Sequence, residues 1–475
     1  MNHVEHIRWS LGFLILLGSC LMLTSCAWVV GEKMDHTALS RVAAEQAYAE
    51  MLTVPVKADR GQVLEAFTLK QCREMALANN LSLHIARLEQ INRTHLSWAE
   101  WSKMLPHVIL AAKFDQGDNI LYGDLLGDSY WSEFYARSSW HLFLETRWSP
   151  TDVALAYYTA RNAGNRLLQS FYDRVRLSQK IIETVEVSFF RLLTIQECLP
   201  LARDLVALRS DVTNRMERLL RERLAAPDDY EKALNDEMKA YHELAELKVQ
   251  FERHANVLAN HIGKARRSDD ADPSTLVKGD LTSPRANEIP QEPEITALKN
   301  RPEIVALGLK QQEMHNELSK SIVKNFPRVS LFWRYLRDPY HHRRHHDGQQ
   351  AGLLLYLDLV ETLAQLKETQ AAHNQRLRAE LELKAITLAV ASQAGVAAKK
   401  YQMAVEKAAL VKKATAASER ALKAAEQRAL GRSLSDIGEK KARANLTAQR
   451  IELVKAIGEA NVCLSELKCA VGTNY

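Results

Sequence analysis

The sequence contains two helical patterns of unusual length, and each directly follows an amphipathic strand pattern. The first helical pattern runs from about Ser149 to about Arg223 after a strand at Ser138 to Trp148. The second runs from about Glu361 to about Arg428 after a strand at Ala351 to Leu359. At 1.5 Å per residue, each helix would extend over roughly 100 Å. Such rods constrain the fold more strongly than any other feature of the chain.

Composition agrees with one helical architecture. The length of 475 residues alone would suggest two or three domains, but the many Ala, Leu, Glu, Lys, Arg and Gln residues favour long helices that share one architecture. The formal net charge of +5 is small and dispersed, so we expect no nucleic-acid partner. The few aromatic residues cluster around Tyr122 to Trp148 and around Phe326 to Tyr356.

The N-terminus has the pattern of a lipoprotein signal. A short apolar segment, Leu11 to Leu23, precedes Leu23-Thr24-Ser25-Cys26, which has the form of a lipobox. We therefore predict a signal peptide at 1–25, acylation of Cys26 and a tethered lead-in at 26–66, with Ala27 favouring the outer membrane. The alternative is an ordinary signal peptide with a chance cysteine. Beyond residue 30 we expect no membrane-spanning helix, and no cofactor apart from the covalent lipid.

The chain repeats itself with a constant offset of about 221 residues. The aligned pairs are Ala76 with Ala297, Leu77 with Leu298, Asn79 with Asn300, Leu88 with Leu309, Gln90 with Gln311, Pro106 with Pro327 and Val108 with Val329. Each repeat is predicted as a helix, a β-hairpin, a long helix, a turn and a return helix.

The repeats define the expected domains. The first covers 67–265, with a first helix from Thr68 to about Met104, a hairpin at 105–148 and a turn at 224–229. Residues 266–293 are rich in Asp, Pro, Ser and Gly and are predicted as a linker or insertion. The second covers 294–475, with a hairpin at 326–359 and a turn at 430–435.

The four strands are apolar on one side. The alternating apolar positions are Val108, Leu110, Ala112 and Phe114; Trp140, Leu142, Leu144 and Trp148; Val329, Leu331, Trp333 and Tyr335; and Leu353, Leu355, Leu357 and Leu359. Strands of about ten residues with this pattern fit a transmembrane barrel, and the alternative is the edge of a soluble sandwich. Four strands cannot close a barrel, and an open sheet edge cannot lie in lipid. We therefore expect a homotrimer with a 12-stranded barrel above a tube of long α-helices.

In its motifs the chain from about Thr68 onward resembles the TolC-like outer-membrane efflux proteins, and the lipobox resembles the lipoprotein branch of that family. The motifs are Phe67-Thr68-Leu69 before the first helix, Asn300-Arg301-Pro302-Glu303, Leu105-Pro106, Phe326-Pro327, Trp148-Ser149-Pro150-Thr151-Asp152, Leu430-Gly431 and Leu434-Ser435-Asp436. The resemblance implies a trimer that exports substrates from an inner-membrane pump. A periplasmic adaptor is expected to meet the two helical turns.

Three features depart from the family pattern. The first turn, Leu224 to Pro227, lacks the glycine of the second turn. The sequence after the fourth strand is Val360-Glu361-Thr362, without the usual Pro, Asp and Gly. Pro200 lies inside the first long helix and is expected to kink or interrupt it.

Candidate site residues lie in the turns and in one loop. Charges at the inner turns are candidates for adaptor docking or for closing the entrance by ion pairing, and Asp228 or Asp229 is also a candidate helix cap. The turn residues are Leu224, Asp228, Asp229, Leu430, Gly431, Arg432, Ser433 and Asp436. A second group is a weak metal candidate in a loop outside the barrel, with an ordinary charged loop or contact with lipid head groups as alternatives. It contains His341, His342, His345 and His346.

No catalytic constellation is present in the sequence, so we expect no enzyme. The chain has no Gly-rich phosphate loop, no zinc-ligand spacing and no serine nucleophile elbow. Four cysteines of the mature chain are interpreted mainly as small buried residues, with disulfides left open: Cys72, Cys198, Cys463 and Cys469.

These patterns predict a passive outer-membrane channel of a tripartite efflux or type I secretion system. The alternative is a periplasmic coiled-coil lipoprotein without a pore, which acts as a scaffold or adaptor. Such a scaffold has no need for four amphipathic strands flanked by tryptophan.

Overall fold

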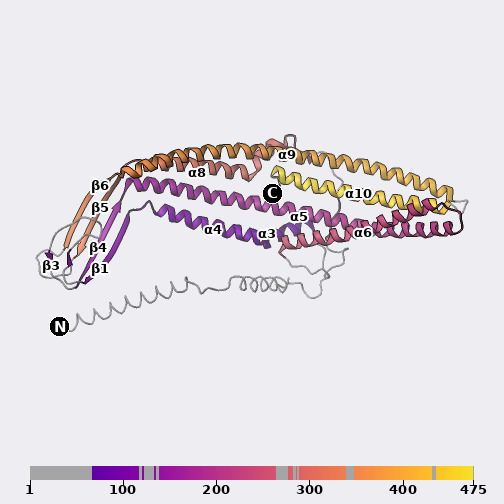
Figure 1. Cartoon of the computed structure of the whole chain (residues 1–475), viewed down its shortest axis with the longest axis horizontal. Coiled ribbons are helices and arrows are strands. Elements are labelled where there is room, and N and C mark those ends of the chain that lie inside the picture. The colour runs from indigo at the N-terminus through magenta and orange to yellow at the C-terminus, as the bar shows by residue number, and fades with distance from the viewer. Residues whose placement is uncertain are drawn as a thin grey trace, which may run out of the picture. The chain divides into compact units, whose positions relative to one another are not determined.

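The strands lie at one end of the long helices, and the turn between α5 (Pro150–Arg221) and α6 (Pro227–Ile262) lies at the other end (Figure 1). The structure is a computed structural model that describes residues 67–116, 120–121, 133–134, 138–263, 277–281, 285, 288–337, 347–429 and 435–473. These residues belong to one compact unit, Leu64–Gly263 with Ala271–Tyr475. The predicted signal peptide, the lipidation site Cys26, the lead-in, the four loop histidines and Leu430 to Ser433 lie outside the described residues.

The first repeat contains four helices and two long strands. Its elements are α3 (Leu69–Asn79), α4 (Leu81–Ser102), β1 (His107–Gln116), β4 (Ser138–Trp148), α5 (Pro150–Arg221) and α6 (Pro227–Ile262), with the two-residue strands β2 (Ile120–Leu121) and β3 (Glu133–Phe134) between β1 and β4. Ser149 caps α5 because its side chain accepts a hydrogen bond from the backbone N–H of Asp152, and Pro150 begins the helix.

The second repeat has the same order of elements. They are α7 (Pro293–Asn300), α8 (Pro302–Lys324), β5 (Arg328–Arg337), β6 (Asp347–Tyr356), α9 (Leu359–Ala429) and α10 (Ser435–Val471). Asp358 begins α9, since its carboxylate accepts hydrogen bonds from the backbone N–H groups of Val360 and Glu361. The predicted class, mainly α with a small β part and two tandem helical hairpins, is confirmed.

Each repeat begins with a broken helix, whereas the sequence predicted one helix from Thr68 to about Met104. Thr68 forms the expected capping box with Gln71. The helix then breaks at Asn80, whose side chain accepts hydrogen bonds from the N–H groups that open α4. The second repeat breaks at the equivalent position, Arg301, and Pro302 begins α8.

Both return helices end at a glycine that contacts the break in its own repeat. Gly263 has φ of +79° and Gly472 has φ of +78°, the left-handed conformation that ends many helices. A Cβ on Gly263 would lie 3.0 Å from the carbonyl oxygen of Asn79, and a Cβ on Gly472 would lie 3.1 Å from the Cβ of Asn300. The repeat is therefore preserved in packing as well as in sequence.

Pro200 does not interrupt α5, contrary to one of the two expected outcomes. The helix is continuous from Pro150 to Arg221. Pro200 itself is exposed, while its neighbours Cys198 and Leu199 are buried in the core. Packing of the neighbouring turns stabilises the helix enough to tolerate the missing backbone donor.

The main core surrounds the middle of α5. It is formed by α5 with α3, α6 and α10, and its largest fully buried side chains include Phe189, Leu192, Phe251 and Ile451. The predicted linker also contributes, because Val277 is buried and pairs as a parallel bridge with Phe67. This core holds the two repeats together below the sheet.

The sequence analysis expects no membrane-spanning helix after residue 30, and among the described helices α9 alone reaches the length and apolar composition of a span. The segment Leu359–Gln427 contains a window long and apolar enough by length and composition alone. Only 17% of this window is buried. The exposed apolar surface of α9 therefore needs a partner to pack against.

Candidate functional site

The four long strands form one antiparallel sheet in the order β1-β4-β5-β6. Each repeat contributes one hairpin, and β4 pairs with β5 to join the two. The long helices follow the same order, because α4 packs on α5, α5 packs on α8, and α8 packs on α9. The sheet and the layer of long helices thus form two continuous walls, and the elements follow one another in the same order in both.

The register brings the predicted apolar positions within the four strands to one face. The predicted strand Ala351 to Leu359 is shifted, because β6 ends at Tyr356, Leu357 follows it and Leu359 begins α9. Leu110 lies opposite Leu144, and Leu144 lies opposite Tyr335. On the other side of β5, Leu331 lies opposite Leu353. Residues directly opposite each other in antiparallel strands share a face. The exposed apolar residues of this face are Val108, Leu110, Trp148, Leu331, Trp333, Leu353 and Leu355.

The opposite face carries charges. Glu145 is only 1% exposed, and its carboxylate lies 2.8 Å from Arg147 Nη2 and 3.3 Å from Arg334 Nη2. Burial of a carboxylate is tolerated when guanidinium groups pair with it. One face of the sheet is therefore mainly apolar, whereas the other carries charged groups together with exposed apolar residues such as Ile109 and Leu354.

The outer strands of the sheet have no strand beside them within the described part of the chain. β1 and β6 are each ten residues long and end the sheet on either side. Each presents a row of backbone N–H and C=O groups, which another strand can pair with. Such edges cannot remain open in lipid.

The helices next to these edges are also apolar on their exposed sides. On α4 the exposed apolar residues are Leu81, Ile85, Leu88, Ile91, Leu96, Trp98 and Trp101, and on α9 they are Leu359, Val360, Leu363, Leu366, Leu377, Leu381 and Leu388. Patches of this extent mark interaction surfaces. Both ends of the wall, β1 with α4 and β6 with α9, therefore need a partner.

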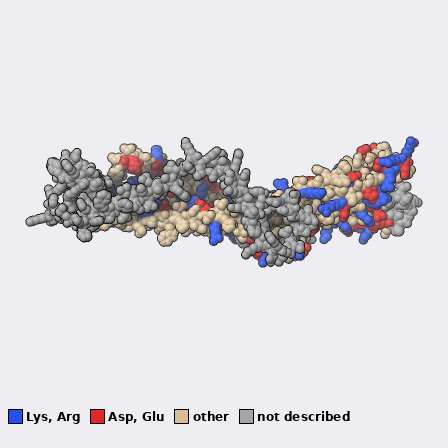
Figure 2. All heavy atoms as spheres, turned by 90° about the horizontal axis from the view of Figure 1, so that it is seen from below, with Lys and Arg blue, Asp and Glu red and all other residues tan. Residues whose placement is uncertain are grey.

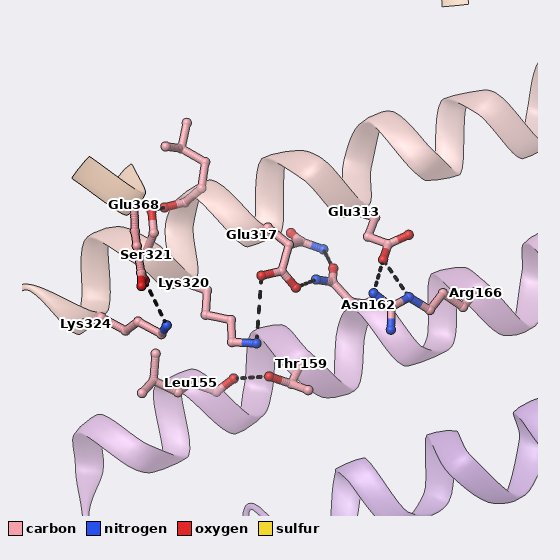
Figure 3. A network of polar contacts seen from close by, with 12 residues as sticks. Leu155, Thr159, Asn162, Arg166, Glu313, Glu317, Lys320, Ser321, Lys324 and Glu368 are labelled. Atoms are coloured by element: carbon pink, nitrogen blue, oxygen red, sulfur yellow. Dashed lines mark hydrogen bonds and ion pairs between the residues drawn. The ribbon is translucent and has the colours of Figure 1, made fainter. Parts of the chain in front are cut away.

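A buried polar network fixes the two repeats against each other between α5 and α8 (Figure 3). Asn162 donates to Glu317 over 2.8 Å and accepts from Asn316 over 2.8 Å. One helical turn further, Arg166 pairs with the buried carboxylate of Glu313. A satisfied buried network specifies one packing register more sharply than apolar contacts do.

At the far end of the helices, Figure 2 shows charged side chains of both signs gathered around the turn between α5 and α6. The structure places the predicted residues Leu224, Asp228 and Asp229 in this region, with Leu224 exposed. Asp436 lies in the first turn of α10, and its side chain is outside the described part. Their roles in adaptor docking or in closing the entrance stay predictions from the sequence.

The expectation that Asp228 or Asp229 caps the return helix is wrong. The helix begins at Pro227, and the capping position belongs to Ala226, which makes no side-chain cap. Proline favours the first helical position, because it lacks the N–H that would have no partner there. Both aspartates therefore lie in the first turn, where the helix dipole favours negative charge.

Arg223 takes the position that glycine occupies in many helix ends. Its φ is +59°. Its N–H donates to the carbonyl of Leu220, and the N–H of Leu224 donates to the carbonyl of Leu219, which together form a Schellman motif. A side chain in this conformation is unfavourable by about 1 kcal/mol.

We therefore expect Arg223→Gly to stabilise the last turn of α5 by about 1 kcal/mol. Hydrogen exchange of the amides at 215–221 measures the local opening free energy. Arg221→Gly is the matched control, because it removes the same side chain from a helical position and should destabilise by about 1 kcal/mol. Equal destabilisation by both variants would contradict the role of Arg223.

Asp211 and Lys440 connect the two repeats near the same end, and sequence reasoning missed them. Lys440 Nζ of α10 pairs with Asp211 Oδ2 of α5. The hydrogen bond from Lys440, with further help from Arg215, holds the pKa of Asp211 below its ordinary value. The partners are 229 residues apart, and no motif or periodicity links them.

The lowered pKa of Asp211 predicts a pH dependence. The ion pair stabilises the contact at pH values above the ordinary aspartate pKa of about 4 and loses this effect as pH falls below it. Between about pH 5 and pH 3, we expect hydrogen exchange at 437–445, corrected for intrinsic rates, to accelerate. Lys440→Gln should show faster exchange already at pH 5 and a smaller change on acidification. A pH response identical in both proteins would contradict the assignment.

The cysteines have the surroundings of structural residues. Cys72 and Cys198 are buried, Cys463 and Cys469 are half-buried, and all four thiols are free. Burial raises the pKa of Cys198 and of Cys469 to about 12, so neither forms a reactive thiolate near neutral pH. Among the described residues, no group of three or more His, Cys, Asp or Glu is arranged to hold a metal.

Comparison with known proteins gives the fold its class. No protein-family profile and no curated protein sequence matches the chain. The CmeC outer-membrane channel of Campylobacter jejuni is 13% identical with a TM-score of 0.70, and the likeness covers 86% of each chain. The Vibrio cholerae outer-membrane protein VceC is 15% identical, with a TM-score of 0.67 over 85% of this chain and 96% of that one.

The open-state MtrE outer-membrane channel of Neisseria gonorrhoeae is 16% identical with a TM-score of 0.66, over 85% of this chain and 88% of that one. At these identities the likeness establishes the fold. The predicted TolC-like fold is therefore confirmed: the chain has the fold of these outer-membrane channels.

Proposed function

We propose that this protein is a passive outer-membrane channel that closes by association of three copies. One observation carries the proposal. The sheet and the layer of helices end together on both sides, at β1 with α4 and at β6 with α9, and each side has an unpaired strand edge next to an exposed apolar helix. If β6 and α9 of one copy meet β1 and α4 of the next, the contact is head-to-tail, and such a contact generates a closed ring when the rotation between copies closes.

The size of the barrel sets a minimum of three copies. Two copies of the four-stranded sheet would give eight strands, and an eight-stranded barrel is filled by its own side chains. Three copies give twelve strands and leave room for an aqueous passage continuous with the ring of long helices. The trimer implied by the family resemblance has the same number.

Within this proposal the protein works in a tripartite efflux or type I secretion system. Substrates reach it from an inner-membrane pump through a periplasmic adaptor that meets the inner turns. A lipid on Cys26 anchors the mature chain in the outer membrane. The likeness to named outer-membrane channels supports the channel role, and a scaffold without a pore would leave the two-faced sheet without a purpose.

The test is conductance. Protein purified from outer membranes in detergent and added to a planar bilayer should give discrete channels, and cross-linking should give a ladder that ends at three chains. A monomer that binds membranes without conducting would overturn the proposal. Cys26→Ser tests the anchor separately: we expect the loss of metabolic palmitate labelling, since no acyl group could be attached.

A further inference from the structure

The charged face of the sheet has one exposed basic group next to a buried acidic one. Arg147 is 43% exposed, while its partner Glu145 is only 1% exposed. Arg334 contacts the other oxygen of the same carboxylate from β5. The carboxylate is thus covered, and a guanidinium is presented at the surface of this face.

The two neighbours across the sheet, His107 of β1 and Phe332 of β5, add no acidic group. His107, the first residue of β1, lies directly opposite Arg147 in the register and is exposed. Arg328, further along the same end of β5, is compensated by Glu361 at 3.6 Å. At the level of Arg147, the described side chains therefore expose the basic residues Arg147 and His107, while the carboxylate of Glu145 is buried.

The position of Arg147 gives this charge its importance. It is the second-last residue of β4, one residue before Trp148 and two before Ser149, which caps the long helix α5. In a ring of three copies, Arg147 would recur three times around the passage where barrel and helices meet. Low-dielectric walls concentrate the field of such charges on passing ions.

We propose that Arg147, held in place by Glu145, forms a ring that favours the passage of anionic solutes over cationic ones. The inference rests on the proposed channel, because the polar face lines a passage only in the closed barrel. Arg147 touches the passing solute, and Glu145 acts through Arg147 as a positioning residue. The cargo class that fits such a ring carries carboxylate, sulfate or phosphate groups.

Two variants separate charge selection from a structural role. Arg147→Gln removes the exposed positive charge, so the ratio of chloride to potassium permeability should fall by about twofold or more in dilute salt. Glu145→Gln keeps the size of the side chain but removes the compensating negative charge, so the ratio should rise. A merely structural pair would not move the ratio in opposite directions.

The measurement is the reversal potential of single channels in a planar bilayer under a potassium chloride gradient. For the unmodified channel we expect a ratio of chloride to potassium permeability above one. As the salt concentration rises, this ratio should approach the ratio of the two ions' mobilities in free solution, because salt screens exposed charges. Arg147→Lys should retain the ratio, and Lys70→Gln, which removes a charge that is exposed on α3, should leave it unchanged. The salt dependence requires no variant and therefore tests the inference even if a substitution prevents folding.

The outcomes distinguish the two proposals. Channels that conduct, but with a ratio at or below one or with a ratio that neither variant changes, would overturn the charge ring and leave the channel function intact. Absence of any conductance would overturn both. Opposite shifts in Arg147→Gln and Glu145→Gln support the ring.

Discussion

Leu353→Arg should abolish the assembled channel, whereas Leu354→Arg should be tolerated. The two leucines are adjacent in β6 and similarly exposed, at 64% and 55%. Leu353 lies opposite Leu331 on the apolar face, and Leu354 lies opposite Ser330 on the polar face. An arginine on the lipid face of a membrane strand costs about 2–4 kcal/mol near the bilayer midplane.

This cost recurs in each copy, so we expect the amount of cross-linked trimer in outer membranes to fall at least about tenfold for Leu353→Arg. Leu354→Arg should retain most of the trimer, because its side chain faces water. Quantitative immunoblotting of membrane fractions measures both. Equal behaviour of the two variants would contradict the assignment of the faces, since a soluble sheet would expose both leucines to water.

Gly458→Ala should strongly destabilise the contact between the two repeats. A Cβ at Gly458 of α10 would lie 1.9 Å from Thr194 Oγ1 and 2.9 Å from Thr194 Cβ on α5. The Thr194 hydroxyl cannot move away freely, because it donates to the carbonyl of Phe190 within its own helix. Forcing the helices apart in a packed core costs about 1–3 kcal/mol.

A double-mutant cycle tests the cause of this destabilisation. Gly458→Ala combined with Thr194→Gly moves the side chain from one helix to the other, and we expect it to recover part of the loss in thermal stability despite the added helical glycine. Gly164→Ala is the control, because a Cβ there meets nothing within 4 Å, and should be neutral or slightly stabilising. An additive double variant would show that the Thr194 contact does not limit the approach of the helices. Thermal melting of purified protein, followed by circular dichroism, measures Gly458→Ala, Thr194→Gly, the double variant and Gly164→Ala.

Much of the fold could be predicted because local sequence patterns determine its elements, and most of these patterns occur in both repeats. Strand alternation and the prolines after the first helices are local signals that the repeat confirms by a second occurrence, whereas Ser149 before Pro150 is a local signal found only in the first repeat. The faces of the sheet followed from the same alternation. The break at Asn80 was missed although its equivalent, Arg301 before Pro302, carries the proline signal.

The site could be predicted less well because its contacts join distant segments. The alternation places Glu145 on the polar face, but its burial depends on Arg334 from the other repeat. The pairing of Asp211 with Lys440 depends on how α5 packs against α10. The capping error at Asp228 has a local cause, since Pro227 determines where the helix begins. Long-range pairing of this kind has no signature in a single sequence.

The number of chains in the purified complex tests the central claim most directly. Light scattering coupled to size-exclusion chromatography, with the detergent contribution subtracted, gives the protein mass of the particle. The account predicts three chains, because three four-stranded sheets close a barrel with an open interior. A stable monomer or dimer that retains the native sheet would contradict it, since a monomer leaves the edges of β1 and β6 open in the membrane and an eight-stranded barrel of two copies has no open interior.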